Sequence, residues 1–271
     1  MKIHVRAPAT TANLGPGFDV AGAALELWNE LEVDEPDGAV DEHHLGVRAF
    51  ARFAPPEEFS FSFTDRIPRE RGLGSSASVV ALGLVAGALA AGAEPTADEL
   101  LAEGLPLEGH GDNLAAALAG GVCLTWNGRI ARIADDVPAA PVAVVPKTRV
   151  KTADARAALP QTVQHADAVF TAGRAALLGA ALARGDDSLF AAGADDRLHE
   201  PYRAEHAPHL YAIREALPAG ALGATLSGSG PTVIVWARKE RVDDVVGALA
   251  EQFPEHEILP LSIATSGAGP V

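Results

Sequence analysis

The sequence has one cysteine, one methionine and only 5% aromatic residues across 271 positions. A single cysteine excludes both an intramolecular disulfide and a cysteine-rich metal centre, so we expect a reducing, cytoplasmic setting. Basic residues are also scarce, with 21 Lys and Arg against 36 Asp and Glu and a formal net charge of -15. This balance argues against nucleic acid or an anionic membrane as a partner. An anionic ligand would therefore need a local site of arginines and backbone N–H groups.

The chain also lacks a long hydrophobic segment of the kind that anchors a protein in a membrane. Residues 1–5 lack the apolar core of a signal peptide. The uncharged run 77–93 is slightly short for a membrane span and is rich in Ala and Gly, so we interpret it as a buried helix. With 48% hydrophobic and 21% charged residues, the composition is typical of a soluble globular protein of one large or two modest domains.

The most informative segment is 71–77, Arg-Gly-Leu-Gly-Ser-Ser-Ala, directly in front of that apolar run. It predicts a glycine-rich loop that leads into the N-terminus of a helix. Backbone N–H groups at a helix start are unpaired and carry partial positive charge, which suits a phosphate. A serine hydroxyl at this point can also reach a phosphate-bound Mg²⁺. The alternative is an ordinary serine-capped helix that follows a glycine turn.

Two further segments concentrate polar groups. Residues 7–19 contain two prolines and two glycines, which predicts a shaped loop that carries Asn13 and Asp19. Residues 107–114 place four polar side chains at the start of a helix: Glu108, His110, Asp112 and Asn113. Asp112 alone would be a plausible N-cap, but one capping residue does not account for all four. We therefore favour a functional role for this segment.

The second half of the chain has a different pattern. Without its helical insertions the order is β-α-β-β-α-β, which is the ferredoxin-like split βαβ arrangement. The strands are expected at 141–146, 221–226, 232–237 and 256–263, and the long helices at 163–183 and 239–252. We predict a domain boundary near residue 138, which gives domains 1–138 and 139–271.

Taken together and in this order, residues 8–19, 72–76, 109–113 and 226–232 resemble the GHMP kinase superfamily of small-molecule kinases. Within it they are most similar to the homoserine kinases. The segments Thr-Ala-Asp-Ala-Arg at 152–156 and Glu-Pro-Tyr-Arg at 200–203 look like two more signatures. The resemblance implies a two-domain α+β fold, with an N-terminal domain like ribosomal protein S5 domain 2 and a ferredoxin-like C-terminal domain. It also implies phosphorylation of the L-homoserine hydroxyl by ATP and Mg²⁺, which gives O-phospho-L-homoserine for threonine biosynthesis.

The same resemblance assigns roles to individual residues. Those expected at ATP are Pro68, Arg71, Gly72, Leu73, Gly74, Ser75, Ser76 and Ala77. Those expected at Mg²⁺ are Ser76 and either Glu108 or Glu103, of which Glu108 matches the motif without a gap. Those expected at the substrate are Asn13, Asp19, His110, Thr152, Arg156 and Arg203. Those expected to take part in catalysis are Asn113, His110 and Asp112.

These residue types suit the chemistry of homoserine. Its ammonium group matches Asp19 with Asn13, and its carboxylate matches the planar donors of Arg156 and Arg203. The amide of Asn113 cannot accept a proton as a base would. Because phosphoryl transfer has a loose transition state, positioning and charge stabilisation can supply most of the catalysis. We hypothesise that Asn113 holds the hydroxyl in line, and that its proton leaves to a phosphate oxygen or to water.

Two other functions remain open from the sequence. One is a GHMP kinase that acts on mevalonate-type or sugar substrates, and the other is a non-catalytic protein on this fold that binds ATP or an amino acid. Residues 34–67 are shorter than is usual in the family, so the adenine-contacting part is hard to locate, and 68–71 carry more charge than expected. The oligomeric state is also open, a homodimer included.

Overall fold

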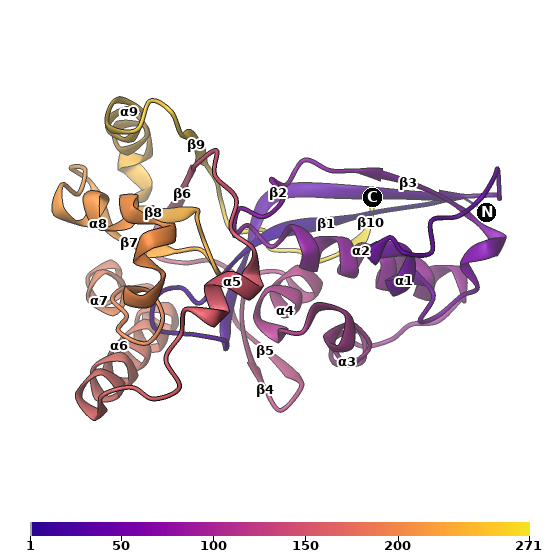
Figure 1. Ribbon diagram of the computed structural model, residues 1–271, viewed down its shortest axis with the longest axis horizontal. Coiled ribbons are helices and arrows are strands. Elements are labelled where there is room, and N and C mark those ends of the chain that lie inside the picture. The colour runs from indigo at the N-terminus through magenta and orange to yellow at the C-terminus, as the bar shows by residue number, and fades with distance from the viewer. Residues whose placement is uncertain (1) are drawn as a thin grey trace.

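A computed structural model describes residues 2–271 as an α+β protein with two separate β-sheets (Figure 1). Met1, the first residue of the predicted N-terminal domain, lies outside the described residues. The first sheet has the strand order β10-β1-β2-β4-β5, with β3 also paired to β2, and the second has the order β7-β8-β6-β9. All strand pairs in both sheets are antiparallel.

The first sheet is built on two long strands, β1 (Ile3–Ala12) and β2 (Ala21–Asp34). Strand β2 pairs with β3 (Ser60–Thr64) near its end and with β4 (Val122–Trp126) near its start, and β5 (Arg129–Ala134) follows β4. The prediction of an irregular loop from residue 7 is wrong for residues 7–12, which continue β1. The register shifts next to Pro8, and such an irregularity is one of the places where a strand tolerates proline.

Four helices cover one face of the first sheet, as Figure 1 shows. They are α1 (Leu45–Phe50), α2 (Ser75–Ala90), α3 (Ala97–Glu108) and α4 (Gly111–Ala119). Helix α2 is the buried helix predicted from the apolar run, and 12 of its 16 residues are buried. It begins and ends two to three residues earlier than the predicted run 77–93. Because α2 is enclosed by its neighbours, its N-terminus and the glycine-rich loop have a fixed position.

Helix α3 confirms one prediction and corrects another. In the sequence, Thr96 with Glu99 three residues later predicts a capping box, and the two residues form it at the start of α3. The sequence also predicts that this helix runs to about Glu103 and ends at Gly104. It continues instead to Glu108 and stops at Gly109 in the left-handed region with φ 81°. Gly104 instead lies inside the helix, where a Cβ would press on the side chains of α2 and α4. This extra turn carries Glu108 to the site described below.

The second sheet has the strand order of the ferredoxin-like arrangement, which confirms that prediction. Its strands are β6 (Ala140–Val145), β7 (Ala221–Leu226), β8 (Val233–Ala237) and β9 (Glu257–Pro260). Its helices are α5 (Thr152–Ala157), α6 (His165–Arg184), α7 (Asp187–Gly193), α8 (Pro208–Glu215) and α9 (Val242–Gln252). Short 3-10 turns occur at 56–58, 201–206 and 239–241.

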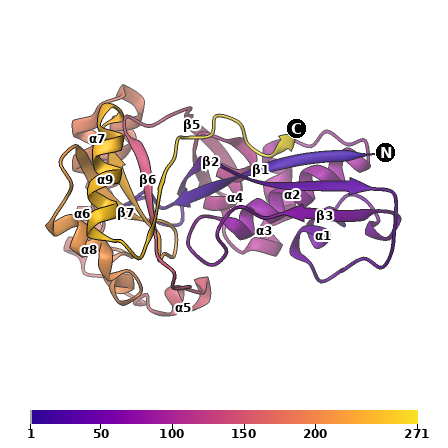
Figure 2. The ribbon, with the colours of Figure 1, turned by 90° about the horizontal axis from the view of Figure 1, so that it is seen from above.

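The C-terminal residues return to the first sheet. Strand β10 (Gly269–Pro270) pairs with β1, and Ile263 forms a bridge with Leu25, so the end of the chain lies beside β1 (Figure 2). The predicted second domain, 139–271, therefore ends in residues that belong structurally to the first sheet. The boundary near residue 138 itself stays a prediction.

Within residues 2–271, α6 is the one helix whose length and apolar composition would allow it to span a membrane. It packs against α7 and β5, and it buries Thr171, Leu178 and Ala181. The cytoplasmic setting and the absence of a membrane partner stay predictions.

The contact between α1 and α2 offers a test of the packing. A Cβ at Gly83 would overlap the carbonyl oxygen of Gly46 and the side chain of Ala49. We expect Gly83→Ala to lower the free energy of unfolding by roughly 1–3 kcal/mol, the usual cost of overpacking. Gly179→Ala, at an open position in α6, should instead raise it by about 0.5–1 kcal/mol. Urea unfolding of both variants checks this, and equal effects at the two positions would contradict the packing described.

Candidate active site

Two adjoining cavities lie where the glycine-rich loop, the start of α4 and the loops of the second sheet meet. The first is lined by residues 68–76 except Arg69, together with Glu108, Asn113, residues 150–152, Gly228 and Ser229. The second is lined by Asn13, Phe18, Asp19, Ser76, Glu108, His110, Asp112, Asn113, Thr152, Arg156, Arg203, Gly228 and Ser229. The cavities share Ser76, Glu108, Asn113, Thr152, Gly228 and Ser229. These six residues mark a junction through which a group could pass from one ligand to another.

The glycine-rich loop presents the open start of α2 to the first cavity. Gly74 precedes the helix in the left-handed region with φ 65°, and no side chain from residues 2–271 caps this end by a hydrogen bond. The first N–H groups are therefore available to an anion. The glycines are also required by packing, because a Cβ at Gly72 would overlap the Ser227 carbonyl and one at Gly74 would overlap the Thr10 hydroxyl.

Ser76 and Glu108 form a polar pair at the junction. The Ser76 hydroxyl donates to Glu108 Oε2 at 2.6 Å. Burial raises the pKa of Glu108 to about 7, although the Ser76 hydrogen bond opposes this shift. Glu103 instead forms an ion pair with Arg52 and lines neither cavity. No cluster of three or more His, Cys, Asp or Glu side chains in the described part of the chain is arranged to hold a metal. A metal at this pair would thus need oxygens from a ligand or water to complete its coordination.

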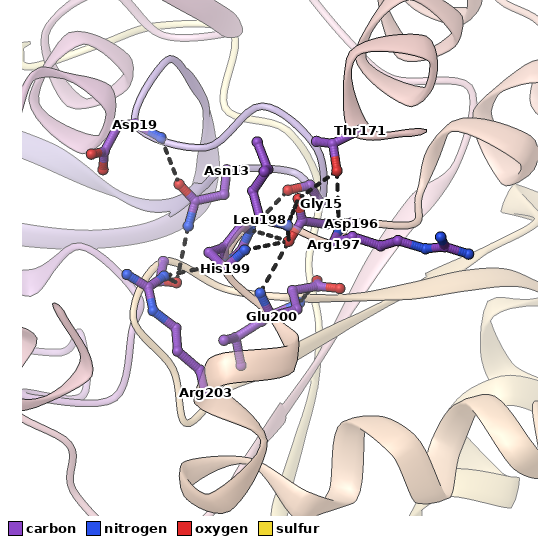
Figure 3. Close-up of polar contacts among 12 residues, drawn as sticks. Asn13, Gly15, Asp19, Thr171, Asp196, Arg197, Leu198, His199, Glu200 and Arg203 are labelled. Carbon is purple, nitrogen blue, oxygen red and sulfur yellow. Dashed lines mark hydrogen bonds and ion pairs between the residues drawn. The ribbon is translucent and has the colours of Figure 1, made fainter. Parts of the chain in front are cut away.

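The amide side chain of Asn13 joins the loop after β1 to the second domain, as Figure 3 shows. Asn13, itself in the left-handed region with φ 72°, donates through Nδ2 to the Gly228 carbonyl at 3.0 Å. Its Oδ1 accepts the backbone N–H of Asp19 at 3.1 Å. This arrangement fixes Asp19 at the edge of the second cavity and ties its loop to the turn between β7 and β8.

Asp19 and Arg156 are paired with each other across the second cavity. The guanidinium donates two hydrogen bonds to the carboxylate, at 3.0 Å and 2.8 Å, in the fork geometry typical of such pairs. Each side chain is 40% exposed, so water screens the pair. The two groups predicted to bind opposite charges of a substrate therefore satisfy one another in the structure.

Arg203 is a buried cation, only 3% exposed. Its Nη1 donates to the Gly228 carbonyl at 3.0 Å and contacts His199 Nδ1 at 3.2 Å. Among residues 2–271, no carboxylate lies within ion-pair distance of it. Burial lowers the pKa of Arg203, and the nearby charge of Asp19 opposes that shift. A buried arginine that lines a cavity without a direct counter-ion is suited to receive an anionic group.

His199 was not identified from the sequence, and it holds Arg203 in place. Its ring is fully buried, contacts the Gly15 carbonyl through Nε2 at 2.8 Å, and stacks on Phe18 with 5.0 Å between ring centroids. Burial lowers its pKa to about 4, although the charge of Asp196 opposes this. The ring is therefore neutral near pH 7, and the Arg203 N–H can donate to its unprotonated Nδ1.

The segment before Arg203 is organised by the buried carboxylate of Asp196 (Figure 3). Its oxygens accept the backbone N–H groups of residues 198, 199 and 200. Glu200 is also buried, and it bridges Arg214 to the backbone of β7 through Leu226. Burial raises the pKa of Glu200 to about 7, against the charge of Arg214. These contacts are structural and fix the direction from which Arg203 enters the site.

Asn113 lies at the junction in the first turn of α4. The sequence suggested Asp112 as the N-cap, but His110 occupies that position and Asp112 lies inside the helix. Asp112 Oδ1 accepts both the backbone N–H of Asn113 at 2.7 Å and its Nδ2 at 3.3 Å. Burial raises the pKa of Asp112. On the other side, the Thr10 hydroxyl donates to Asn113 Oδ1 at 2.7 Å.

The remaining predicted residues are distributed as follows. His110 and Thr152 line the second cavity, where the Thr152 hydroxyl lies 3.4 Å from that of Ser229. Ala77 lines neither cavity and packs in the core of the first domain instead. Residues that line or support the site without having been predicted include Thr10, Phe18, His199, Gly228 and Ser229. Thr10, Phe18, Gly228 and Ser229 lie inside the motif segments, and His199 directly precedes one of them.

The arrangement combines three chemical elements. An uncapped helix start offers N–H groups to an anion, a Ser–Glu pair offers oxygens to a cation, and a second cavity offers both charges to a small polar ligand. These elements meet at an amide, Asn113, that is held from two sides. Such a site can place an anionic donor and a small charged acceptor next to each other.

The chain is similar to known proteins over most of its length. Residues 43–121 match the GHMP kinases N terminal domain, and residues 177–255 match the GHMP kinases C terminal. A homoserine kinase from Streptomyces avermitilis is 38% identical, with 98% of this chain and 94% of that protein covered. One from Gloeobacter violaceus is 39% identical, with 92% of each chain covered.

Solved structures show the same fold. A homoserine kinase from Cytophaga hutchinsonii superposes with a TM-score of 0.88 at 25% identity, over 100% of this chain and 97% of that one. A putative homoserine kinase from Listeria monocytogenes gives 0.82 at 28% identity, over 99% of each. A mevalonate kinase gives 0.72 at 16% identity over 97% of this chain and 99% of that one, which shows a shared fold alone.

The buried, neutral His199 predicts a pH dependence of stability. Its pKa in the folded state, about 4, lies below its ordinary value of 6.5, so the unfolded chain binds its proton first as the pH falls. His199 should therefore support folding above about pH 6.5 and lose that contribution progressively toward pH 4. We expect the stability advantage of the wild type over His199→Gln to shrink by roughly 1–2 kcal/mol between pH 7 and pH 5. Urea unfolding at both values measures it, and a constant difference would contradict a neutral buried ring.

Proposed function

Because the chain belongs to the homoserine kinase family of the GHMP kinases, we propose that it transfers the γ-phosphoryl group of ATP to the hydroxyl of L-homoserine. The single observation that supports this substrate most strongly is the second cavity, which combines Asp19 with two arginines. Homoserine carries an ammonium and a carboxylate beside its hydroxyl, and a substrate without both charges would leave part of this set unpaired.

The first cavity is proposed as the ATP phosphate site. Its loop carries the uncapped start of α2, whose N–H groups suit phosphate oxygens. A further cavity lined by residues 37–41, His44, Val47, Ser60, Phe61 and Phe63 is our candidate for the adenine. There His44 packs on Phe63 with 4.1 Å between ring centroids. Burial lowers the pKa of His44, so it is a neutral ring next to which a base could stack.

We assign Mg²⁺ to Ser76 and Glu108 rather than to Glu103. The Ser76 hydroxyl and the Glu108 carboxylate already lie at 2.6 Å from each other, and both line the two cavities at once. One hydroxyl and one carboxylate fit the preference of Mg²⁺ for few protein oxygens together with phosphate and water. When bound, the ion would neutralise phosphate charge. A positive charge here would also stabilise the ionised form of Glu108, which burial disfavours.

In the second cavity, the substrate would replace the ion pair that the protein makes with itself. The homoserine carboxylate can take the guanidinium of Arg156 and the buried guanidinium of Arg203, while its ammonium takes Asp19. The zwitterion would therefore replace one ion pair of the protein by an ammonium–Asp19 pair and a carboxylate shared by both arginines, and it would leave no buried charge unpaired. Its hydroxyl end would then lie toward Asn113 at the junction.

The proposed chemistry has no dedicated base. Asn113 is held by Thr10 and Asp112, and it would orient the attacking hydroxyl while the loop N–H groups stabilise the charge on the transferred phosphoryl group. Asp112 Oδ1 is occupied by two donors from Asn113, so we assign Asp112 to positioning. The proton of the hydroxyl leaves to a phosphate oxygen or to water.

The experiment that tests the function is ADP release with ATP and Mg²⁺, in the presence and absence of L-homoserine. The proposal predicts release that depends strongly on homoserine. Release that instead depends on mevalonate or a sugar would point to another GHMP kinase. Binding of ATP and homoserine without turnover by any acceptor would point to a binding protein.

The assignment of the metal ligand separates two glutamates. Glu108→Gln removes the proposed carboxylate ligand, so we expect the Mg²⁺ concentration for half-maximal activity to rise about tenfold or more. Glu103→Gln is the matched control, because its carboxylate pairs with Arg52 outside both cavities. It should stay within about twofold of the wild type. The reverse ranking would move the assignment to Glu103.

Asp112→Asn tests the absence of a base. Loss of a general base ordinarily costs 10²- to 10⁴-fold in rate. The asparagine oxygen can still accept the Asn113 hydrogen bonds, so we expect kcat with homoserine to remain within about tenfold of the wild type. A loss of about a thousandfold or more, in a folded variant with unchanged KM, would show that Asp112 takes the proton.

A further inference from the structure

Thr10 is a fully buried residue of β1 whose side chain reaches the reaction site from behind. It is 0% exposed and lines neither cavity. Its hydroxyl donates to Asn113 Oδ1 at 2.7 Å, although 103 positions separate the two residues in the chain. A hydroxyl buried this deeply would cost stability if it had no hydrogen-bond partner. In the described chain, the partner of the Thr10 hydroxyl is Asn113.

The contacts of Asn113 determine which way its amide points. Asp112 Oδ1 accepts the Asn113 backbone N–H as well as the side chain, so this oxygen acts as an acceptor. The amide nitrogen must therefore face Asp112, which leaves the amide oxygen to face Thr10. Without the Thr10 hydroxyl, the amide oxygen would lose its donor, and the amide would be held from the Asp112 side alone. Thr10 and Asp112 together select one orientation.

Thr10 is also hydrogen-bonded to the glycine-rich loop that lines the first cavity. Its backbone N–H donates to the Leu73 carbonyl at 3.1 Å. The hydroxyl lies against Gly74, at which a Cβ would overlap it. Because a β-branched side chain in a strand has restricted χ1, the hydroxyl has little freedom. One side chain thus connects the glycine-rich loop to the amide at the junction.

We propose that Thr10 is a positioning residue of the transfer reaction, which fixes the Asn113 amide relative to the glycine-rich loop. The inference rests on the proposed function, because it concerns the step in which Asn113 orients the acceptor hydroxyl. Thr10 lines neither cavity, so it would contact neither ATP nor the acceptor. Its loss should therefore lower the rate of transfer more than the binding of ATP or acceptor.

The test compares Thr10→Val, which replaces the hydroxyl by a methyl group of similar size, with Thr10→Ser, which keeps the hydroxyl. We expect Thr10→Val to lower kcat about tenfold, with KM for ATP and acceptor within about twofold, and Thr10→Ser to recover most of the rate. If Thr10→Val does not fold, Thr10→Ala takes its place. Full activity of the hydroxyl-free variant would overturn the proposal.

Two controls separate positioning from general destabilisation. Ser78→Ala removes another fully buried hydroxyl, which donates from α2 to the Ala7 carbonyl of β1 at 3.1 Å without contacting Asn113. It should lower the melting temperature and leave kcat unchanged. In an Asn113→Ala background, Thr10→Val should add less than a further twofold loss. A full tenfold loss in that background would show that Thr10 does not act through Asn113.

The outcome is separable from that of the proposed function. If the wild type uses an acceptor other than homoserine, the proposed substrate fails, and the Thr10 comparison is made with that acceptor. If homoserine is the acceptor and Thr10→Val is fully active, the proposed function stands and the role of Thr10 falls.

Discussion

The backbone carbonyl of Gly228 is the contact on which the rest of the site depends. It accepts Asn13 Nδ2 from the loop after β1 and Arg203 Nη1 from the segment before α8, each at 3.0 Å. The backbone N–H of Gly228 donates to the Ala12 carbonyl at the end of β1. One residue in the turn between β7 and β8 therefore joins both sheets and lines both cavities.

The neighbouring Ser227 connects the same turn to the glycine-rich loop. Its hydroxyl lies within hydrogen-bond distance of the Gly72 carbonyl, at 2.6 Å, and of the Thr11 hydroxyl, at 2.9 Å. Gly72 can approach so closely only because it has no Cβ. The glycines of the loop thus do two things: they leave N–H groups open at the start of α2, and they let the second domain pack directly on the loop. A substitution there would disturb the domain contact and, under the proposed function, phosphate binding as well.

The charges of the site follow from this packing. Arg203 is buried, and its Nη1 contacts His199 and Gly228. Because both partners are neutral acceptors, they do not neutralise the positive charge of the guanidinium. Asp19 and Arg156, which are half exposed, neutralise each other. One carboxylate and two guanidiniums are therefore the groups that we propose for the zwitterion. They would give its carboxylate a local cationic site in a chain with a net charge of -15.

Much of this could be predicted because it depends on local pattern. The capping box at Thr96, the buried helix α2, the strand order of the second sheet and the motif segments were all readable in the sequence. The hydrogen bond from Thr10 to Asn113 and the contact of His199 with Gly15 join residues 103 and 184 positions apart, so no local pattern indicates them. The return of β10 to the first sheet escaped prediction for the same reason.

The central claim is that the second cavity recognises an amino-acid zwitterion through Asp19 and the two arginines. Its most direct test is kcat/KM for L-homoserine, for 4-hydroxybutanoate, which lacks the ammonium, and for 3-aminopropan-1-ol, which lacks the carboxylate. We expect kcat/KM for each analogue to be lower by roughly a hundredfold or more, because each leaves a charged group of the site unpaired. An analogue that is phosphorylated as efficiently as homoserine would contradict this recognition.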